Sequence, residues 1–295
     1  MKKDITEEFC MIDDFVKEYK KMQNNFELQD KNHIIRHKTR TPGLSESEII
    51  CIVLLFQKSP CKNFKFFYNS YAQLYKSEFP KMPSYARFVA LMPRIIHIML
   101  VLLYSILGKP SSKNHFIDST SIAVCSTKRI SRNKLFKHIA KLGKTTKGWF
   151  FGFKLHVVIN TTGELVSIKF TKGNISDVSV LNSMSQNIKG RLFGDKGYIS
   201  RRLFLMLYNR GLKLITSIKK TMRNSPIDVY EKIMLRKRSL VETVFDFLKN
   251  KLQLEHTRHR STSNFLLHII STLVCYQMKK TKPSISLDYM MIANP

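Results

Sequence analysis

The sequence predicts an all-helical N-terminal region followed by an α/β domain built on a mixed sheet. Apolar residues recur at helical spacing up to about residue 108 and alternate as in strands beyond it. The segment GKPSSKN (108–114) separates the two patterns and has the composition of a linker. The α/β part also holds three acidic motifs, although the chain has a formal net charge of +29. We therefore expect a helical domain over 1–110, an α/β domain over 111–280 with a basic insertion at 126–148, and a C-terminal tail over 281–295.

The helical region is expected to contain four helices. The clearest start is a capping box, in which Ser45 caps the helix and Glu48 reaches back to it. Pro93 falls inside the last apolar pattern, so a bend is expected there. The longest apolar run, Ile95–Leu107, is shorter than the roughly 20 residues that span a bilayer and is interpreted as a buried core helix. The expected helices cover Ile5–Met22, Ile49–Phe56, an aromatic segment after residue 60, and Ser84–Leu107.

The α/β region begins with strand patterns. A turn at Gly163 joins two of them into a hairpin, and the only tryptophan, Trp149, is expected to pack in the core. The expected strands are His115–Val124, Trp149–Asn160, Glu164–Thr171, Arg191–Asp195 and Leu212–Ile218, and the expected helices are Ser176–Gln186, Ser200–Asn209 and Asp228–Lys251, the last broken near Lys237. This β-β-β-α-β-α-β-α order is that of a ribonuclease H-like core.

The three acidic motifs are FIDST, FGDKGY and RSLVETVFDFLKN, which contain Asp118, Asp195 and Glu242. Two of these carboxylates end strands and the third lies on a helix, the order in which a ribonuclease H-like core gathers ligands for two divalent metals. Such a site needs hard oxygen ligands that converge from different elements. Asp118 is expected to bridge the two ions. Asp195 is expected to add a ligand to one ion, and Glu242 to complete the ligands of the other. Asp246, one turn after Glu242, is the alternative third ligand, and each residue alone has an ordinary explanation as a turn former, cap or surface charge.

The charge balance favours a polyanionic partner. Lys and Arg number 50 against 21 Asp and Glu, which indicates nucleic acid first and an anionic membrane second. A lysine bias that comes from an AT-rich genome would explain the choice of Lys over Arg, but not the shortage of Asp and Glu. The five cysteines are scattered without C-x-x-C spacing, which argues against a zinc ribbon or a disulfide framework. The acidic N-terminus lacks the apolar stretch of an export signal, so a cytoplasmic protein is expected.

Several basic residues are expected to contact DNA phosphates. The insertion that follows Asp118 is almost entirely basic or polar, Lys196 directly follows Asp195, and the run EHTRHRS carries two arginines. For all of them the alternative is ordinary solvated surface charge. The expected contacts are Lys128, Arg129, Arg132, Lys134, Lys196, Arg258 and Arg260.

The motifs FIDST, GWFFGFKLH, GNISD, FGDKGY and R-x-x-x-E-x-x-x-x-x-x-K resemble those of DDE transposases of bacterial insertion sequences, most closely the insertion-sequence 982 family. The resemblance covers nearly the whole chain and is specific in the combination of motifs. It implies Asp118, Asp195 and Glu242 as the catalytic triad. Arg238 and Lys249 match the flanking cations of the last motif and are expected to hold DNA phosphates beside the metals. The tyrosine position of that motif is Leu235 here, a departure from the family pattern.

The resemblance implies a transposase that binds the terminal inverted repeats of its element, frees a 3′-hydroxyl and joins that end to target DNA. Two Mg²⁺ ions are expected as cofactors, with Mn²⁺ able to substitute. The expected partner is double-stranded DNA, bound by a homodimer, with no membrane involved. The helical front is expected to recognise the element ends, and its alternative role is dimerisation or structural support. The expected location is the bacterial cytoplasm, at the nucleoid. Two alternatives stay open: a nuclease on the same fold that hydrolyses without joining, and a catalytically inactive DNA-binding protein such as a repressor.

Overall fold

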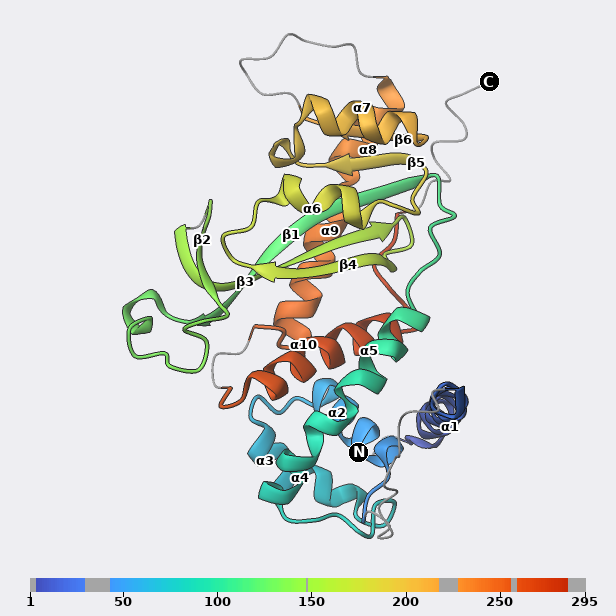
Figure 1. The fold of residues 1–295 in the computed structure, drawn as a ribbon, viewed down its shortest axis with the longest axis vertical. Helices are drawn as coiled ribbons and strands as arrows, with labels where there is room; N and C mark the ends of the chain where they lie inside the picture. The colour runs from blue at the N-terminus through green and yellow to red at the C-terminus, as the bar shows by residue number, and fades with distance from the viewer. Residues whose placement is uncertain (1–3, 30–42, 147, 218–227, 256–258, 286–295) are drawn as a thin grey trace. The chain divides into compact units, whose positions relative to one another are not determined.

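The structure is a computed structural model that describes residues 4–29, 43–146, 148–217, 228–255 and 259–285 (Figure 1). The chain divides into two compact units. The first comprises Met1–Ile106 and His259–Tyr276, and the second comprises Leu107–Arg258 and Gln277–Pro295. The division near Ile106 lies close to the linker that the sequence indicates. The last helix groups with the first unit, although the sequence pattern assigns it to the α/β domain.

The first unit is helical. Its capping box is confirmed, because the Ser45 hydroxyl accepts from the Glu48 amide and the Ser45 amide donates to the Glu48 carboxylate at 2.7 Å. The bend at Pro93 is also confirmed as a 3-10 turn between two α-helices. The elements of this unit are α1 (Thr6–Gln29), α2 (Glu46–Lys58), α3 (Phe64–Asn69), η1 (Tyr71–Tyr75), α4 (Tyr85–Leu91), η2 (Met92–Ile95), α5 (Ile96–Ser105) and α10 (Thr262–Gln277).

Helix α2 forms the centre of this unit, since its residues from Ile49 to Gln57 are all buried. Gln57 satisfies its buried amide by donating to the Ser271 hydroxyl of α10 at 2.9 Å, so the two helices are joined by a polar contact inside an apolar core. The segment Tyr85–Ser105 is long and apolar enough to cross a membrane by length and composition alone. Its most apolar stretch is 44% buried inside the protein, and core helices pass the same test, so this segment is weak evidence for a span.

The second unit contains a mixed sheet in the order β2-β3-β1-β5-β6, with β4 also paired to β3. The β1–β3, β3–β4 and β2–β3 pairs are antiparallel, whereas β1–β5 and β5–β6 are parallel. The predicted hairpin is confirmed, with Gly163 in the turn at a φ of +73° that favours glycine. The strands are β1 (Asn114–Cys125), β2 (Lys141–Thr145), β3 (Gly148–Asn160), β4 (Leu165–Lys172), β5 (Gly190–Gly194) and β6 (Leu212–Thr216).

Helices cover both faces of this sheet, and Figure 1 shows α6 in front of the strands and α9 behind them. One core packs Ile117 of β1 against Leu181 of α6 and Leu207 of α7. Val241 and Val244 of α9 are fully buried as well. The helices are α6 (Asp177–Met184), α7 (Arg201–Asn209), α8 (Val229–Lys237) and α9 (Ser239–Asp246), with 3-10 turns η3 (Thr127–Arg129) and η4 (Lys196–Tyr198) and a π-helical turn η5 (Phe247–Lys251).

This strand order confirms the predicted ribonuclease H-like core. β1 is central. The antiparallel strand β3, which also pairs with β2 and β4, extends the sheet on one side, and the two parallel strands β5 and β6 extend it on the other. The predicted break in the last long helix is confirmed at Arg238, between α8 and α9. The predicted basic insertion contains a short strand, β2, that pairs with the start of β3. Residues 286–295 of the predicted tail lie outside the described part of the chain.

Candidate active site

Asp118 and Asp195 occupy equivalent places on neighbouring parallel strands. The β1–β5 register pairs Asn114 with Arg191 and Phe116 with Phe193. Continuing this register by two residues sets Asp118 beside Asp195, just past the carboxyl end of β5. Adjacent strands lie about 4.8 Å apart, so the two carboxylates act on each other, and the charge of Asp195 contributes to raising the pKa of Asp118. The register thus brings two of the three predicted carboxylates together.

Asp118 is a largely buried carboxylate that needs a positive partner. Its side chain is 23% exposed. The Ser119 amide donates to its Oδ1 at 2.8 Å, and Arg238 Nη1 donates to its Oδ2 at 2.8 Å. Burial raises the pKa of Asp118 above its usual value, although both of these donors oppose the rise. The surroundings therefore penalise its negative charge and favour a neighbouring cation.

Arg238 joins the third predicted carboxylate to the first. Its Nη2 donates to Glu242 Oε1 at 3.5 Å, one helical turn away. The Glu242 side chain is 63% exposed, whereas that of Arg238 is 20% exposed. The exposed, longer contact with Glu242 is weaker than the contact with buried Asp118. The guanidinium therefore lies between Asp118 and Glu242 and binds Asp118 more firmly.

The predicted three-carboxylate metal site is not assembled in this arrangement. Among the described residues, no three His, Cys, Asp or Glu side chains are grouped closely enough to hold a metal ion. The guanidinium of Arg238 supplies positive charge beside Asp118 instead. The donors nevertheless fit a hard divalent cation, because Asp118 and Asp195 are oxygen ligands from adjacent strands. Burial, the main cause of the raised pKa of Asp118, also favours a cation beside it.

A fourth carboxylate, Asp177, lies next to this pair and is absent from the sequence-predicted site. It is the first residue of α6, and its Oδ1 accepts from the Ser119 hydroxyl at 2.7 Å. Lys154 Nζ lies 3.4 Å and His156 Nδ1 lies 3.5 Å from the same oxygen. Because Ser119 directly follows Asp118, Asp177 anchors the backbone that carries the catalytic candidate. Lys154 and His156 share a strand face, a signal that the sequence does contain.

His156 is uncharged at neutral pH. Its side chain is fully buried, and burial lowers its pKa to about 4 even though Asp177 opposes this shift. Its Nε2 lies 2.9 Å from the Thr171 hydroxyl of β4. The positive partner of Asp177 is therefore Lys154, whose side chain is 12% exposed.

Tyr198 places a buried hydroxyl beside the carboxylates. Within the described residues its oxygen has no hydrogen-bond partner. Burial raises its pKa above the usual value, and the charges of Asp177 and Asp118 add to the rise. The side chain also packs against Gly194, where an added Cβ would lie 3.1 Å from the ring. Tyr198 is thus a neutral donor available inside the site, and it was not singled out from the sequence.

Comparison with known proteins assigns the family. A family model described as "Transposase DDE domain" matches residues 109–262, just over half of the chain. The chain belongs to this transposase family. The matched range contains Asp118, Asp195 and Glu242. A search of curated proteins gives no match.

One solved structure that this transposase resembles is the crystal structure of the Mos1 strand transfer complex. The two chains are 14% identical, and the match covers 90% of this chain and 85% of that one, with a TM-score of 0.28. A score this low carries no weight, so the fold assignment depends on the strand order alone.

Lys249 of this transposase is engaged within the protein. Its Nζ donates to the Ser121 carbonyl of β1 at 2.7 Å and to Glu255 at 3.1 Å. Glu255 in turn accepts from the Ala123 amide at 3.1 Å. Lys249 thereby ties the π-helical turn to β1. Asp246, the alternative third ligand, is exposed and accepts from the Asn250 amide of η5 at 2.6 Å.

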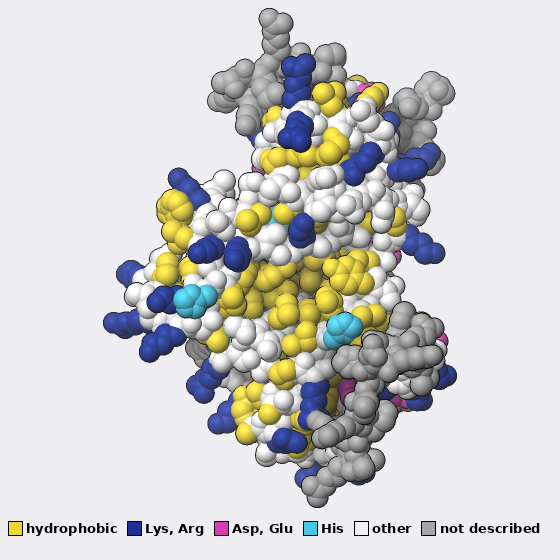
Figure 2. All heavy atoms as spheres, viewed as in Figure 1, with side chains coloured by type: hydrophobic (Ala, Val, Ile, Leu, Met, Phe, Trp, Pro, Cys, Tyr) yellow, Lys and Arg dark blue, Asp and Glu magenta, His cyan; other side chains and the backbone are white. Residues whose placement is uncertain are grey.

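The remaining predicted DNA contacts lie mostly at the surface. In Figure 2 dark blue basic side chains gather at the left edge, where Figure 1 places β2 and the segment before it. Arg258 lies outside the described residues, and Arg260 is exposed in the first unit. No contact with DNA is tested for any of them, so these assignments stay predictions. The predicted DNA contacts that are exposed in the second unit are Lys128, Arg129, Arg132, Lys134 and Lys196.

The prediction that Trp149 packs in the core is wrong. Its side chain is 58% exposed. The β1–β3 register begins at Phe151 and the β3–β4 register begins at Phe153, so Trp149 pairs only with Lys144 of β2. The start of β3 therefore extends beyond the rest of the sheet as a two-stranded ribbon. Further along β3, neighbouring elements bury alternate side chains, but they do not cover Trp149.

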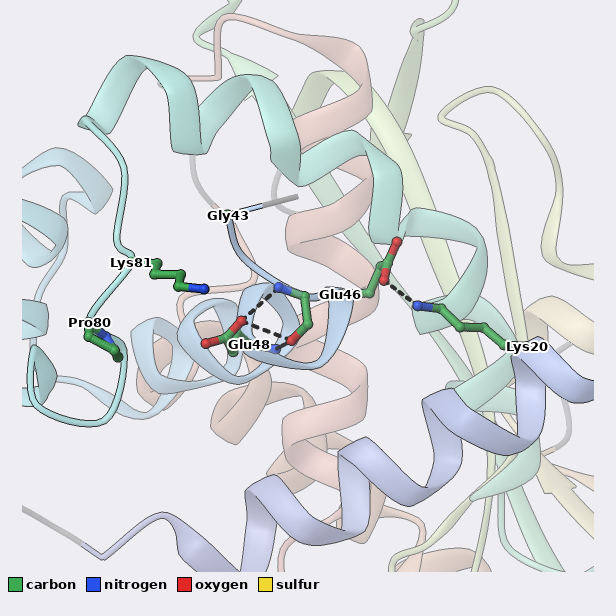
Figure 3. Close-up of a pocket in the computed structure, with 7 residues that line it drawn as sticks. Lys20, Gly43, Glu46, Glu48, Pro80 and Lys81 are labelled. Carbon is green, nitrogen blue, oxygen red and sulfur yellow. Dashed lines mark hydrogen bonds and ion pairs between the residues drawn. The ribbon is translucent and has the colours of Figure 1, made fainter. Parts of the chain in front are cut away.

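A pocket of about 390 Å³ occurs in the first unit (Figure 3). Its lining includes the capping box of α2 and the ion pair between Lys20 and Glu46 at 2.6 Å. Glu48 is engaged by the capping box, and none of the three predicted catalytic carboxylates lines the pocket. The pocket therefore does not compete with the carboxylate site as the place of the chemistry.

Proposed function

We propose that this transposase cuts DNA at the ends of its element and joins the freed 3′ ends to target DNA at the Asp118–Asp195–Glu242 site. The observation that carries the proposal is the placement of Asp118 beside Asp195 by the parallel register, with Glu242 linked to Asp118 through one shared guanidinium. Hydrolysis and strand transfer are both in-line displacements at phosphorus, so one site serves both steps.

In this proposal Asp118, Asp195 and Glu242 would hold two Mg²⁺ ions, and Glu242 would turn from Arg238 to do so. When bound, such ions would lower the pKa of the attacking water or 3′-hydroxyl and stabilise the leaving oxygen, and Mn²⁺ has the same ligand preference. Asp177 fixes the Ser119 side of β1 and so keeps Asp118 in position. The buried Tyr198 hydroxyl provides a neutral hydrogen-bond donor near the reacting phosphate.

Arg238 has two successive roles in the proposal. Without a divalent cation it compensates the buried charge of Asp118 at 2.8 Å. With a divalent cation on Asp118 this contact would be redundant, and the guanidinium would be free to bind a DNA phosphate. Arg suits this exchange because its planar fork binds carboxylate and phosphate oxygens in the same geometry.

The wider assignments are also proposals. We place the chain in the insertion-sequence 982 family on its motifs, with double-stranded element ends and target DNA as partners and the bacterial cytoplasm as its location. The charge of +29 supports a DNA partner. The helical first unit is assigned to end recognition, and a homodimer on DNA accounts for cutting two ends together.

The decisive experiment maps nicks on DNA that carries the ends of the source element, with Mg²⁺ or with EDTA. Asp118→Asn, Asp195→Asn and Glu242→Gln are each expected to reduce metal-dependent cleavage by about 100-fold or more, because each removes a charged ligand while preserving shape. Asp246→Asn is the matched control. It removes an exposed carboxylate of the same helix and is expected to leave cleavage within about twofold.

The alternatives give different results in the same assay. Pre-cleaved ends joined to target DNA identify a transposase, whereas hydrolysis without joining identifies a nuclease on the same fold. DNA footprints without any metal-dependent nick identify a binding protein. Cleavage that survives all three substitutions would refute the assigned site.

A further inference from the structure

Trp149 is an exposed aromatic side chain held on a rigid support. It lies at the start of β3, is 58% exposed, and pairs across the ribbon with Lys144. The Thr145 hydroxyl donates to the Gly148 carbonyl at 3.2 Å, which fixes the ribbon next to the indole. Tryptophan is usually highly buried, so an indole exposed on an ordered strand indicates a surface that contacts a partner.

A lysine lies over this indole, and the sequence around it is strongly basic. Lys144 Nζ lies over the ring, 5.6 Å from its centroid. Residues 119–163 include nine Lys or Arg and no Asp or Glu. A second copy of this strongly basic chain is repelled by such a surface, whereas a polyanion is attracted to it. The exposed, described cations of this stretch are Lys128, Arg129, Arg132, Lys134, Lys137, Lys141 and Lys144.

The partner must therefore offer both negative charge and flat apolar rings. Single-stranded nucleic acid offers this combination, since its phosphates pair with lysines and its bases stack on aromatic side chains. In a duplex the faces of each base are already covered by its neighbours. An indole on a narrow ribbon therefore selects a base that has left the stack, or one in an unpaired strand.

The ribbon also sets where along the DNA this contact falls. Asp118 pairs with Val157 in the β1–β3 register, and Trp149 lies eight residues before Val157 on the same strand. At about 3.4 Å per residue the two positions are at most roughly 27 Å apart. A DNA strand advances about 3.4 Å per nucleotide, so this span corresponds to about eight nucleotides.

We propose that Trp149 is a stacking site for an unpaired nucleobase of DNA, with Lys144 beside it as a phosphate contact, up to about eight nucleotides from the phosphate at Asp118. The proposal rests on the proposed function as a DNA-cutting transposase and adds a requirement for an unpaired base. It assigns a ligand to the exposed end of the β2–β3 ribbon, which takes no part in the carboxylate site.

The test uses the fact that Trp149 is the only tryptophan in the chain. Intrinsic fluorescence of the full-length protein is titrated with single-stranded dT20 and with a blunt 20-base-pair duplex, while anisotropy of labelled copies reports binding independently. Saturable quenching by dT20 that exceeds quenching by the duplex at equal occupancy supports the proposal. Anisotropy is then compared for the wild type, Trp149→Ala, Trp149→Phe and, as a matched control, Leu142→Ala, which truncates another exposed apolar side chain of the same ribbon (44% exposed).

Trp149→Ala is expected to weaken dT20 binding about tenfold and duplex binding less than twofold, whereas Trp149→Phe retains most of the affinity. Leu142→Ala is expected to leave both affinities unchanged. Two results would overturn the stacking site while leaving the proposed function intact. One is DNA binding by anisotropy with no change in tryptophan emission, and the other is an equal loss of affinity for both DNA forms in Trp149→Ala. A blue shift with anionic lipid vesicles but no response to DNA would assign the indole to a membrane surface instead. Absence of all DNA binding by anisotropy would refute the proposed function itself.

Discussion

Replacing Asp177 by Asn tests whether this carboxylate positions Asp118. The substitution keeps an acceptor for the Ser119 hydroxyl but removes the charge that lies 3.4 Å from Lys154. With an effective dielectric constant of about 20, that ion pair is worth roughly 5 kcal/mol before desolvation. Most of this is offset by the desolvation of Lys154, which is 12% exposed. We expect a net loss of about 2 kcal/mol, measured as a lower urea midpoint at pH 7.

The same substitution is expected to slow single-turnover DNA cleavage by about 10- to 100-fold, because small displacements of a reacting group have effects of this size. A double-mutant cycle with Ser119→Ala separates positioning from general destabilisation. If Asp177 acts through Ser119, the second substitution adds little to the first, with a coupling energy of about 1 kcal/mol. Asp177→Asn with wild-type stability and cleavage within twofold, or fully additive losses in the cycle, would refute this reasoning.

Three further substitutions test the charge balance of the core. Arg238→Gln removes the cation that competes for Asp118, so Mg²⁺ is expected to raise the melting temperature more than in the wild type; an equal or smaller shift contradicts the competition. His115 is fully buried with both ring nitrogens lacking partners among the described residues, and burial lowers its pKa to about 4. At this residue the unfolded chain binds more protons than the folded protein. The contribution of about 3 kcal/mol to the free energy of unfolding is therefore complete above pH 6.5 and is lost as pH falls toward 4. His115→Leu is expected to flatten the pH dependence of urea unfolding in this window, and an unchanged slope contradicts it. Lys249→Met breaks the contact with the Ser121 carbonyl and is expected to lower stability by about 1–2 kcal/mol, read from the urea midpoint; unchanged stability with weaker DNA binding would instead favour a direct DNA contact.

Local sequence rules predicted the features that depend on one segment at a time. The Ser45–Glu48 capping box, the bend at Pro93 and the turn at Gly163 each follow from side-chain or backbone chemistry within a few residues. The pairing of Asp118 with Asp195 needed only the strand order, although Asp118 lies within β1, which continues to Cys125, and only Asp195 follows the end of its strand. Features of this kind can be predicted from the apolar periodicity and the local motifs of one sequence.

The features that were missed depend on contacts between distant segments. Asp177 could not be assigned to the site from local rules, because its partners Ser119 and Lys154 lie 58 and 23 residues away in sequence. The contact of Arg238 with Glu242 follows from their spacing of one helical turn, but its stronger contact with Asp118 depends on how the α8–α9 junction packs against β1. Trp149 was assigned to the core because strand alternation presumes a covering layer, and at the free end of the ribbon that layer is missing.

The contacts of Arg238 and Lys154 explain how one basic protein tolerates three acidic groups in a small volume. Asp118 is compensated by Arg238 and Asp177 by Lys154, which leaves Asp195 as the exposed carboxylate of the group. A divalent cation held by Asp195 and Asp118 would compete with this guanidinium for Asp118. The positive charge freed in that exchange would lie next to the place where a DNA phosphate must bind. Metal and DNA binding are expected to reinforce each other for this reason, since each favours the state in which Arg238 has left Asp118.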